Sequence, residues 1–291
     1  MKTKRKFNIV DVILIALAVL AAVGVLALRN RVTGASVSRA TTPMRCTVEM
    51  TWAPADMANQ MKVGDRVYHS TDSKYIGTVA AVRCAPHKEN SYLPAEGRFV
   101  QYESKDGYDI YLTIEGDGYT TDRDVVIGEV NPKVCGEMAI KGQGFARMAY
   151  VVNLDLMGAE LQKNEDVGNG SLEAVYVVQL TDMREMLLDG VQVGDKFYEK
   201  TSKALMGEVI DVRIEDHVET QLGPGGETID AKKENSWDLY VTLRGRAVEK
   251  PDGYYLDGGT ELKVGASVTM NSQRFERTGV FYAMESIEGV K

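Results

Sequence analysis

The side chains of this sequence most capable of chemistry are its three cysteines. A cysteine thiolate is a nucleophile and a metal ligand, but the sequence has neither a Cys-x-x-Cys pair nor the Cys-His spacing of a zinc site. An internal repeat, described below, pairs Cys46 with Tyr176, Cys84 with Ile214 and Cys135 with Val264. Because these partners are bulky and apolar, we expect free thiols in core or half-core positions. A Cys84–Cys135 disulfide, or a metal or catalytic role, is the alternative.

The histidines are the next candidates, because imidazole is both a general base and a metal ligand. His87 and His217 occupy matching positions of the repeat, whereas His69 has no counterpart. Both matched histidines lie in charged segments, residues 85–107 and 215–236, which are the longest predicted loops. Loops on a rigid scaffold often carry binding sites, so these two segments are the candidate binding surface. We expect solvated histidines there, with a ligand-binding pair as the alternative.

Two aromatic residues complete the set of candidate ligand contacts. Tyr92 lies in the first of these segments and Trp237 directly follows the second. Aromatic rings with a polar edge suit stacking on sugar rings, although most tyrosines in a β-rich sequence are ordinary strand residues.

Familiar catalytic motifs are absent from the sequence. It has no phosphate-binding glycine loop, no His-Glu-x-x-His, no EF-hand loop and no Gly-x-Ser-x-Gly. Its abundant carboxylates are explained by an acidic surface. We therefore predict no catalytic residue, no cofactor and no metal, in a protein that is not an enzyme. An enzyme whose carboxylates converge only in the fold is the alternative.

A repeated hairpin must position all of these residues. The stretch from Val191 to Arg213 aligns without a gap with Met61 to Arg83, at an offset of 130 residues, and nine of the 23 positions are identical. Each copy reads as a turn, a short strand, a polar turn and a second alternating strand. The retained residues are those that a hairpin needs: Gly64, Asp65, Gly77, Gly194, Asp195 and Gly207.

The retained glycines have two predicted structural roles. Gly64 and Gly194 precede Asp65 and Asp195 at the start of a strand, where a turn with positive φ suits glycine. Gly77 and Gly207 lie inside strands, where glycine marks a bulge or a tight bend of a barrel.

The repeat extends well beyond the hairpin and defines the fold class. Lead strands are predicted at Thr47–Thr51, Tyr108–Ile114, Val175–Leu180 and Trp237–Leu243, with short helices at Ala55–Met61 and at Asp182–Leu188, the latter capped by Asp182. A weaker half-repeat, of about 71 residues, divides each copy. Two halves supply about six strands, enough to close a small barrel. We predict a mainly β protein with short helices, in which residues 44–157 and 173–291 form tandem duplicated β-barrel-like domains joined by the linker 158–172.

An apolar N-terminal stretch indicates a membrane anchor. Residues 1–8 are basic, residues 9–28 are almost entirely apolar, and residues 29–43 form a polar tether. The apolar length suits a transmembrane helix. The preceding positive charges place the N-terminus in the cytoplasm and the body outside. A cleaved signal peptide is the alternative, and both alternatives place the body outside the cytoplasmic membrane.

The charge distribution limits the class of partner. The net charge is −8, and because the N-terminal region is basic, the remaining body is more acidic still. An acidic body repels phosphate backbones, so nucleic acid is excluded as an expected partner. The expected partners are the lipid bilayer, through residues 9–28, and envelope proteins or further copies of this chain.

The chain resembles a bacterial family of single-pass membrane proteins of unknown function. The resemblance rests on the stretches KFNIVDVILIALAVLAAVGV, VGDKFY, MGEVIDVR, DLYVTLRG, LKVGASVTM and ERTGVFYAME. It covers essentially the whole chain and implies an N-terminal anchor followed by the duplicated body. It transfers no catalytic residue. A looser, fold-level similarity to the barrels of membrane-fusion adaptors lacks the helical segment that those proteins carry.

These observations favour a non-enzymatic scaffold or adaptor of the cell envelope, and surface polysaccharide export or assembly is one process in which such an adaptor would act. The alternative function is an extracytoplasmic ligand- or glycan-binding module that uses the segments 85–107 and 215–236, with His87, Tyr92, His217 and Trp237 as contacts.

Overall fold

The computed structural model describes residues 40–162 and 165–289. The predicted membrane segment, residues 9–28, lies outside the described residues. No helix in the described part of the chain combines the length and apolar character needed to cross a membrane.

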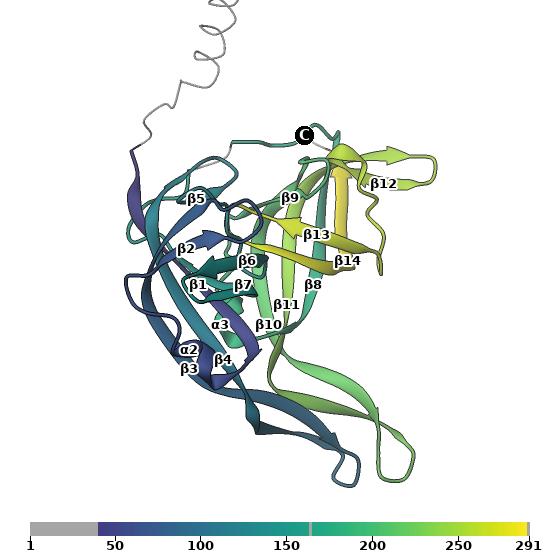
Figure 1. Cartoon of the computed structure of the whole chain (residues 1–291). Coiled ribbons are helices and arrows are strands. Elements are labelled where there is room, and N and C mark those ends of the chain that lie inside the picture. Colours follow the sequence, from purple (N-terminus) through teal and green to yellow (C-terminus); the bar gives the residue numbers. More distant parts are fainter. Residues whose placement is uncertain (1–39, 163–164, 290–291) are drawn as a thin grey trace, which may run out of the picture. The chain divides into compact units, whose positions relative to one another are not determined.

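The first repeat forms a closed six-stranded barrel, whose strands are labelled in Figure 1. Its strands follow one another around the barrel in the order β1-β7-β6-β2-β3-β4, and pairing of β4 with β1 closes the ring. These strands are β1 (Thr42–Ala53), β2 (Arg66–His69), β3 (Tyr75–Leu93), β4 (Arg98–Thr120), β6 (Glu137–Gly142) and β7 (Phe145–Asp155). Outside the ring, β5 (Val125–Ile127) pairs with β4, and the short α2 (Ala55–Ala58) follows β1.

The second repeat forms the same barrel. Its ring runs β8-β14-β13-β9-β10-β11 and closes where β11 pairs with β8. These strands are β8 (Leu172–Met183), β9 (Lys196–Glu199), β10 (Leu205–Leu222), β11 (Thr228–Lys250), β13 (Ser267–Asn271) and β14 (Glu276–Gly289). The elements outside the ring are β12 (Gly253–Leu256), α3 (Glu185–Leu188) and the 3-10 turn η1 (Asp257–Gly259). The predicted mainly β fold with a duplicated barrel is confirmed.

Alternation along the strands fills each barrel. In β1 the residues Met44, Cys46, Val48 and Met50 are fully buried, whereas Arg45 and Thr47 between them are partly exposed. This period of two is the geometry of a pleated strand. Tyr176 is the buried counterpart of Cys46 in β8, as the alignment predicts.

The three cysteines are free in the structure, as expected, but they differ in their surroundings. Burial raises the pKa of the Cys46 thiol to about 12, and burial likewise raises that of Cys135 to about 11. Both therefore stay protonated near neutral pH, which excludes them as ready nucleophiles. Cys84 is exposed, so the expectation that it occupies a core position is wrong, although its partner across the ladder, Ile110, is buried.

Four matching turns confirm the half-repeat. Each begins with a residue in the left-handed region, at φ values of 92°, 68°, 92° and 88° for Gly64, Cys135, Gly194 and Gly265. In each turn this residue donates its N–H to the second strand of the hairpin: Gly64 to Val79, Cys135 to Val151, Gly194 to Val209 and Gly265 to Phe281. Cys135 therefore corresponds to Gly265, and its sequence alignment with Val264 is wrong by one residue.

Because Cys135 occupies a glycine position, we expect Cys135→Gly to be more stable than Cys135→Ala by about 1 kcal/mol, since a Cβ opposes positive φ. Urea unfolding of both variants measures the difference. Cys84, at an ordinary strand position, provides the control, because there Ala should be more stable than Gly by about 0.5–1 kcal/mol. The same order at both positions would contradict the assignment of strain to Cys135.

Gly77 and Gly207 mark tight bends, as predicted. A Cβ at Gly77 would overlap the carbonyl of Glu115, and one at Gly207 would overlap the carbonyl of Arg244. The missing side chain lets the start of β3 approach β4 closely, and that of β10 approach β11.

Candidate functional site

Two long hairpins project beyond the barrels (Figure 1). Pairing of β4 with the barrel strand β1 ends at Tyr108, and pairing of β11 with β8 ends at Trp237. Beyond these points β3 pairs only with β4, and β10 only with β11, within the described residues. We call residues 86–108 arm 1 and residues 216–237 arm 2. The prediction of loops at residues 85–107 and 215–236 is therefore wrong, because antiparallel ladders extend both segments as strands, each with a shift of register at the base of the arm.

The two arms lie against each other. Three hydrogen bonds join them: Asn90 Nδ2 to the Glu234 carbonyl at 3.0 Å, the Tyr92 hydroxyl to the Leu222 carbonyl at 2.9 Å, and Asn235 Nδ2 to Gln101 Oε1 at 2.8 Å. Phe99 of arm 1 and Ala231 of arm 2 are buried although they lie outside both barrels. Mutual burial explains how two-stranded hairpins, marginal in isolation, stay extended.

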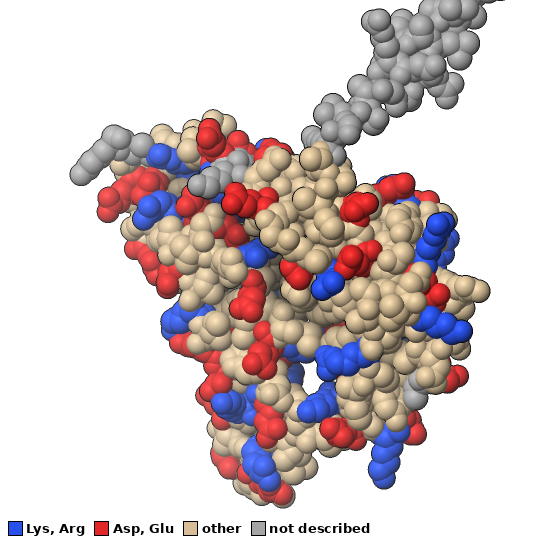
Figure 2. Space-filling view, turned by 90° about the vertical axis from the view of Figure 1, so that its left-hand side faces the viewer, with Lys and Arg blue, Asp and Glu red and all other residues tan. Residues whose placement is uncertain are grey.

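A cleft of about 980 Å³ opens at the base of the arms, between the two repeats. The first repeat contributes Thr51, Arg83, His87, Asn90 and Asp109, and the second contributes Asp182, Arg184, Lys233, Ser236 and Arg277. In Figure 2 an opening in the lower half of the molecule has Lys and Arg side chains at its border. Cations and carboxylates are interleaved in the cleft, so opposite charges can neutralise one another there.

The matched histidines are held by matched carboxylates. His87 Nδ1 lies 2.7 Å from Asp109 Oδ1, and His217 Nδ1 lies 2.7 Å from Asp238 Oδ1. Their side chains are only 16% and 12% exposed, so the expectation of solvated histidines is wrong. The bond to Nδ1 orients each ring and leaves Nε2 for other partners. Asp109 and Asp238 begin matching stretches of the two repeats, DIYLT and DLYVT. This match was the signal that could have identified them as partners of the histidines.

His69 lies elsewhere, with Nδ1 2.7 Å from Asp72 Oδ1 in the turn after β2. Among the described residues, no three His, Cys, Asp or Glu side chains gather closely enough to hold a metal ion.

In the second repeat, Asp182 lies next to the His217–Asp238 pair, and its backbone N–H donates to Asp238 Oδ1. It accepts hydrogen bonds from Ser236 Oγ at 2.5 Å and Lys233 Nζ at 2.8 Å. Burial alone would raise the pKa of Asp182, but these two donors outweigh burial and lower it. The predicted role of Asp182 as a helix cap is wrong, because α3 begins at Glu185. Asp182 belongs to an irregular part of β8, with φ +54°.

In the first repeat, the position of Asp182 is occupied by Trp52. Its φ is +51° and the residue is 51% exposed. A Cβ at Gly107 would overlap the indole, and the His87 ring centroid lies 4.8 Å from that of Trp52. Gly107 is the counterpart of Ser236. The polar Asp182–Ser236 contact of the second repeat is therefore replaced in the first repeat by a tryptophan whose ring packs against a glycine. Trp52 was not among the candidate residues predicted from the sequence, although the repeat aligns it with Asp182.

The two aromatic residues that the sequence did select have different surroundings. Tyr92 packs on Phe99 with ring centroids 5.3 Å apart, and its hydroxyl is bonded to arm 2. Trp237 is half-buried at the base of arm 2, opposite Asp216 and Met183. Tyr92 thus holds the arms together, and only His87 of the selected residues lines the cleft.

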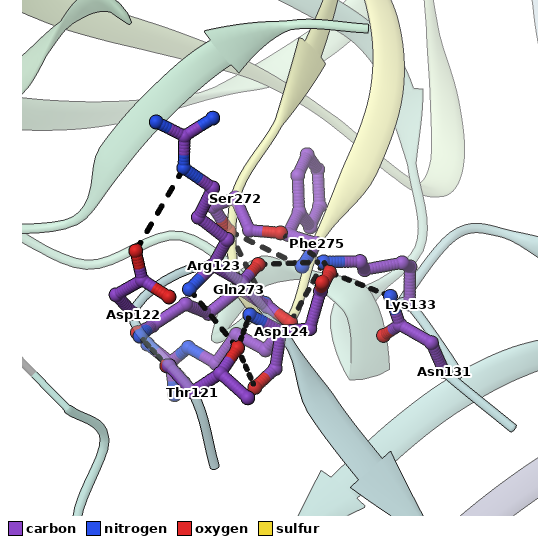
Figure 3. Close-up of polar contacts among 10 residues, drawn as sticks. Thr121, Asp122, Arg123, Asp124, Asn131, Lys133, Ser272, Gln273 and Phe275 are labelled. Atoms are coloured by element: carbon purple, nitrogen blue, oxygen red, sulfur yellow. Dashed lines mark hydrogen bonds and ion pairs between the residues drawn. The ribbon is translucent and has the colours of Figure 1, made fainter. Parts of the chain in front are cut away.

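A buried lysine joins the two barrels. Lys133 Nζ donates to oxygens on both repeats: the carbonyls of Arg123, Ser272 and Gln273 at 3.2, 2.5 and 3.0 Å, and Asp124 Oδ1 at 3.0 Å. Figure 3 shows the lysine reaching to the turn formed by Ser272 and Gln273. Burial lowers the pKa of Lys133, and Asp124 offsets part of that effect. Next to it, Val134 forms a parallel bridge with Phe275.

A buried ion pair forms a second joint. Glu49 of β1 is fully inaccessible to solvent, and Arg184, just before α3, donates to both of its carboxylate oxygens. Tyr111 lies opposite Glu49 on β4. The two joints make the repeats one unit and set the arms side by side.

The fold and the cleft define a tandem-repeat, double-barrel protein with paired hairpin arms. The family model described as Domain of unknown function (DUF4330) matches residues 2–155 and again residues 157–285, so the chain belongs to that family. Neither curated proteins nor solved structures gave a match. The resemblance to a family of unknown function with a duplicated domain is confirmed.

Proposed function

We propose that this protein is a non-enzymatic scaffold or adaptor of the cell envelope, anchored in the membrane by residues 9–28, whose paired arms bind a partner protein outside the cytoplasmic membrane. The arms carry the proposal, because they extend past both barrels and expose apolar side chains. Leu222 is 66% exposed, and Tyr102 and Val218 are close to half exposed. Exposed strand edges are sites at which another chain can pair.

The rigidity of the joints supports the same role. An adaptor binds more tightly when its contact surface is already ordered, because less conformational freedom is lost on binding. Lys133 and the Glu49–Arg184 pair hold the barrels together, and three hydrogen bonds hold the arms together. The arms are thus presented as one preformed surface.

Photocrosslinking in cells tests whether the arms contact a partner protein. The full chain would carry a photoreactive residue at Leu222 in arm 2 or, as the control, at Val193, which is equally exposed on the second barrel. We expect a discrete heterologous adduct from position 222 and none from position 193. Recovery of only the chain itself, or of the same adducts from both positions, would count against an arm-mediated adaptor.

Exposure of Cys84 provides a test of location. If the body is extracytoplasmic, a membrane-impermeant maleimide will label the chain in intact cells. Labelling will occur mainly at Cys84, because Cys46 is buried. Cys84→Ser should remove most of the label. Labelling that requires cell lysis would place the body inside and contradict the proposal.

A further inference from the structure

We propose that the exposed indole of Trp52 and the cleft beside it form a saccharide-binding site. This site lies at the base of arm 1, apart from the exposed apolar side chains Tyr102, Val218 and Leu222 on which the proposed adaptor function rests. Thr51, which precedes the tryptophan, and His87, which contacts its ring, both line the cleft. Trp52 does not itself line the cleft, but it adjoins it through Thr51 and through the ring of His87.

The backbone holds Trp52 where a bulky residue is unfavourable. A left-handed conformation is tolerated by Gly, Asn and Asp and is strained for large side chains. Asp182 at the equivalent position also has positive φ, and its carboxylate makes local hydrogen bonds. Tryptophan lacks that compensation. Strained residues of this kind concentrate at ligand-binding sites.

Gly107 allows the indole ring of Trp52 to pack against arm 1. Because any Cβ there would overlap the indole, glycine is the residue that lets the ring lie against arm 1. The His87 ring supports the indole at an interplanar angle of 41°. About half of the residue nevertheless remains exposed, so the indole is fixed in place and still presents apolar surface to solvent. The flat, apolar face of a pyranose ring is the ligand surface that such an indole matches.

The adjoining cleft supplies partners for hydroxyl groups. Asn90 and Gln101 line it with planar amides, and Asn90 Oδ1 is buried without a hydrogen-bond partner among the described residues. An amide oxygen in this state accepts a hydrogen bond from a hydroxyl donor. The volume of about 980 Å³ lies within the range of small-molecule sites and accommodates a short oligosaccharide.

The charges of the cleft favour a neutral, hydroxyl-rich ligand. Arg184 is paired with Glu49, Lys233 with Asp182, and His87 with Asp109. Arg83 lies over the ring of Tyr111, 4.0 Å from its centroid. Arg83, Arg184 and Lys233 are thus engaged within the protein, and Arg277 donates to the carbonyls of Thr181 and Asp182. Engagement of these cations disfavours a phosphate-rich ligand. Saccharide hydroxyls instead suit the mixture of donors and acceptors.

Tryptophan fluorescence tests the site directly. The chain has two tryptophans, so Trp237→Phe leaves Trp52 as the single reporter. This full-length variant, in a detergent that contains no sugar, would first be screened against an array of bacterial surface glycans. It would then be titrated with any retained oligosaccharide, and with N-acetylglucosamine oligomers in every case. We expect at least one saccharide to shift the emission of Trp52 in a saturable manner.

The matched variant is Trp52→Asp combined with Gly107→Ser, which reproduces the pair found in the second repeat and should therefore fold. We expect its saccharide affinity to fall at least tenfold in a direct binding assay, with an unchanged melting curve. No retained glycan, or equal binding by this variant, would overturn the proposal. Loss of saccharide binding with normal photocrosslinking at position 222 would separate this site from the adaptor function.

Discussion

Replacing Lys133 with methionine should lower the free energy of unfolding by about 2 kcal/mol, because methionine keeps the apolar stem and removes the donors. The carbonyl of Ser272 then remains buried without the lysine, and an unsatisfied group of this kind costs roughly 1–3 kcal/mol. The carbonyl of Gln273 still accepts the N–H of Val125 and contributes less. The partly exposed Asp124 can regain water and contributes less. Urea unfolding of the full chain, followed by circular dichroism, measures the loss.

Lys263 is the matched control for this prediction. It occupies the same position of the second repeat, 130 residues on, but it is exposed. Lys263→Met should therefore change stability by no more than about 0.5 kcal/mol. Equal losses from the two substitutions would show that the contacts of Lys133 across the repeats do not stabilise the protein.

Replacing Arg184 with alanine should also destabilise the protein by about 3 kcal/mol. The substitution leaves the carboxylate of Glu49, which is inaccessible to solvent, without its cationic partner. Breaking a buried pair in this way costs about 3–5 kcal/mol. We expect the lower end because the Arg184 side chain is 40% exposed, so water can enter once it is removed. Thermal and urea unfolding both measure the change.

An exposed ion pair and a double variant provide the controls for Arg184→Ala. Arg45→Ala breaks the Arg45–Glu115 pair, whose side chains are both well exposed, and should cost no more than about 1 kcal/mol. Adding Glu49→Gln to Arg184→Ala removes the buried charge and should recover part of the loss. Glutamine is the residue at the equivalent position, Gln179. Strictly additive effects would show that the two residues are not coupled.

The architecture of the described residues could be predicted from the sequence. Alternation of apolar residues along β1 and β8 predicted which side chains fill the barrels, and the repeat of 130 residues predicted two of them. Gly64 and Gly194 predicted the turns. These features follow from backbone conformation and from burial of one strand face, which act between residues close in the chain. They are therefore readable from local sequence.

The arms, the joints between the barrels and the cleft could not be predicted from the sequence, because they depend on contacts between distant segments. The segment before Tyr92 is polar enough to resemble a loop, and its ladder with β4 and its contact with arm 2 make it a strand. Lys133 looks like an ordinary surface lysine until a turn 139 residues away surrounds it. Trp52 becomes a candidate ligand contact only because Gly107 leaves room for its ring. Each feature depends on contacts between residues that are far apart in the sequence. The pattern of neighbouring residues does not predict which distant groups come into contact.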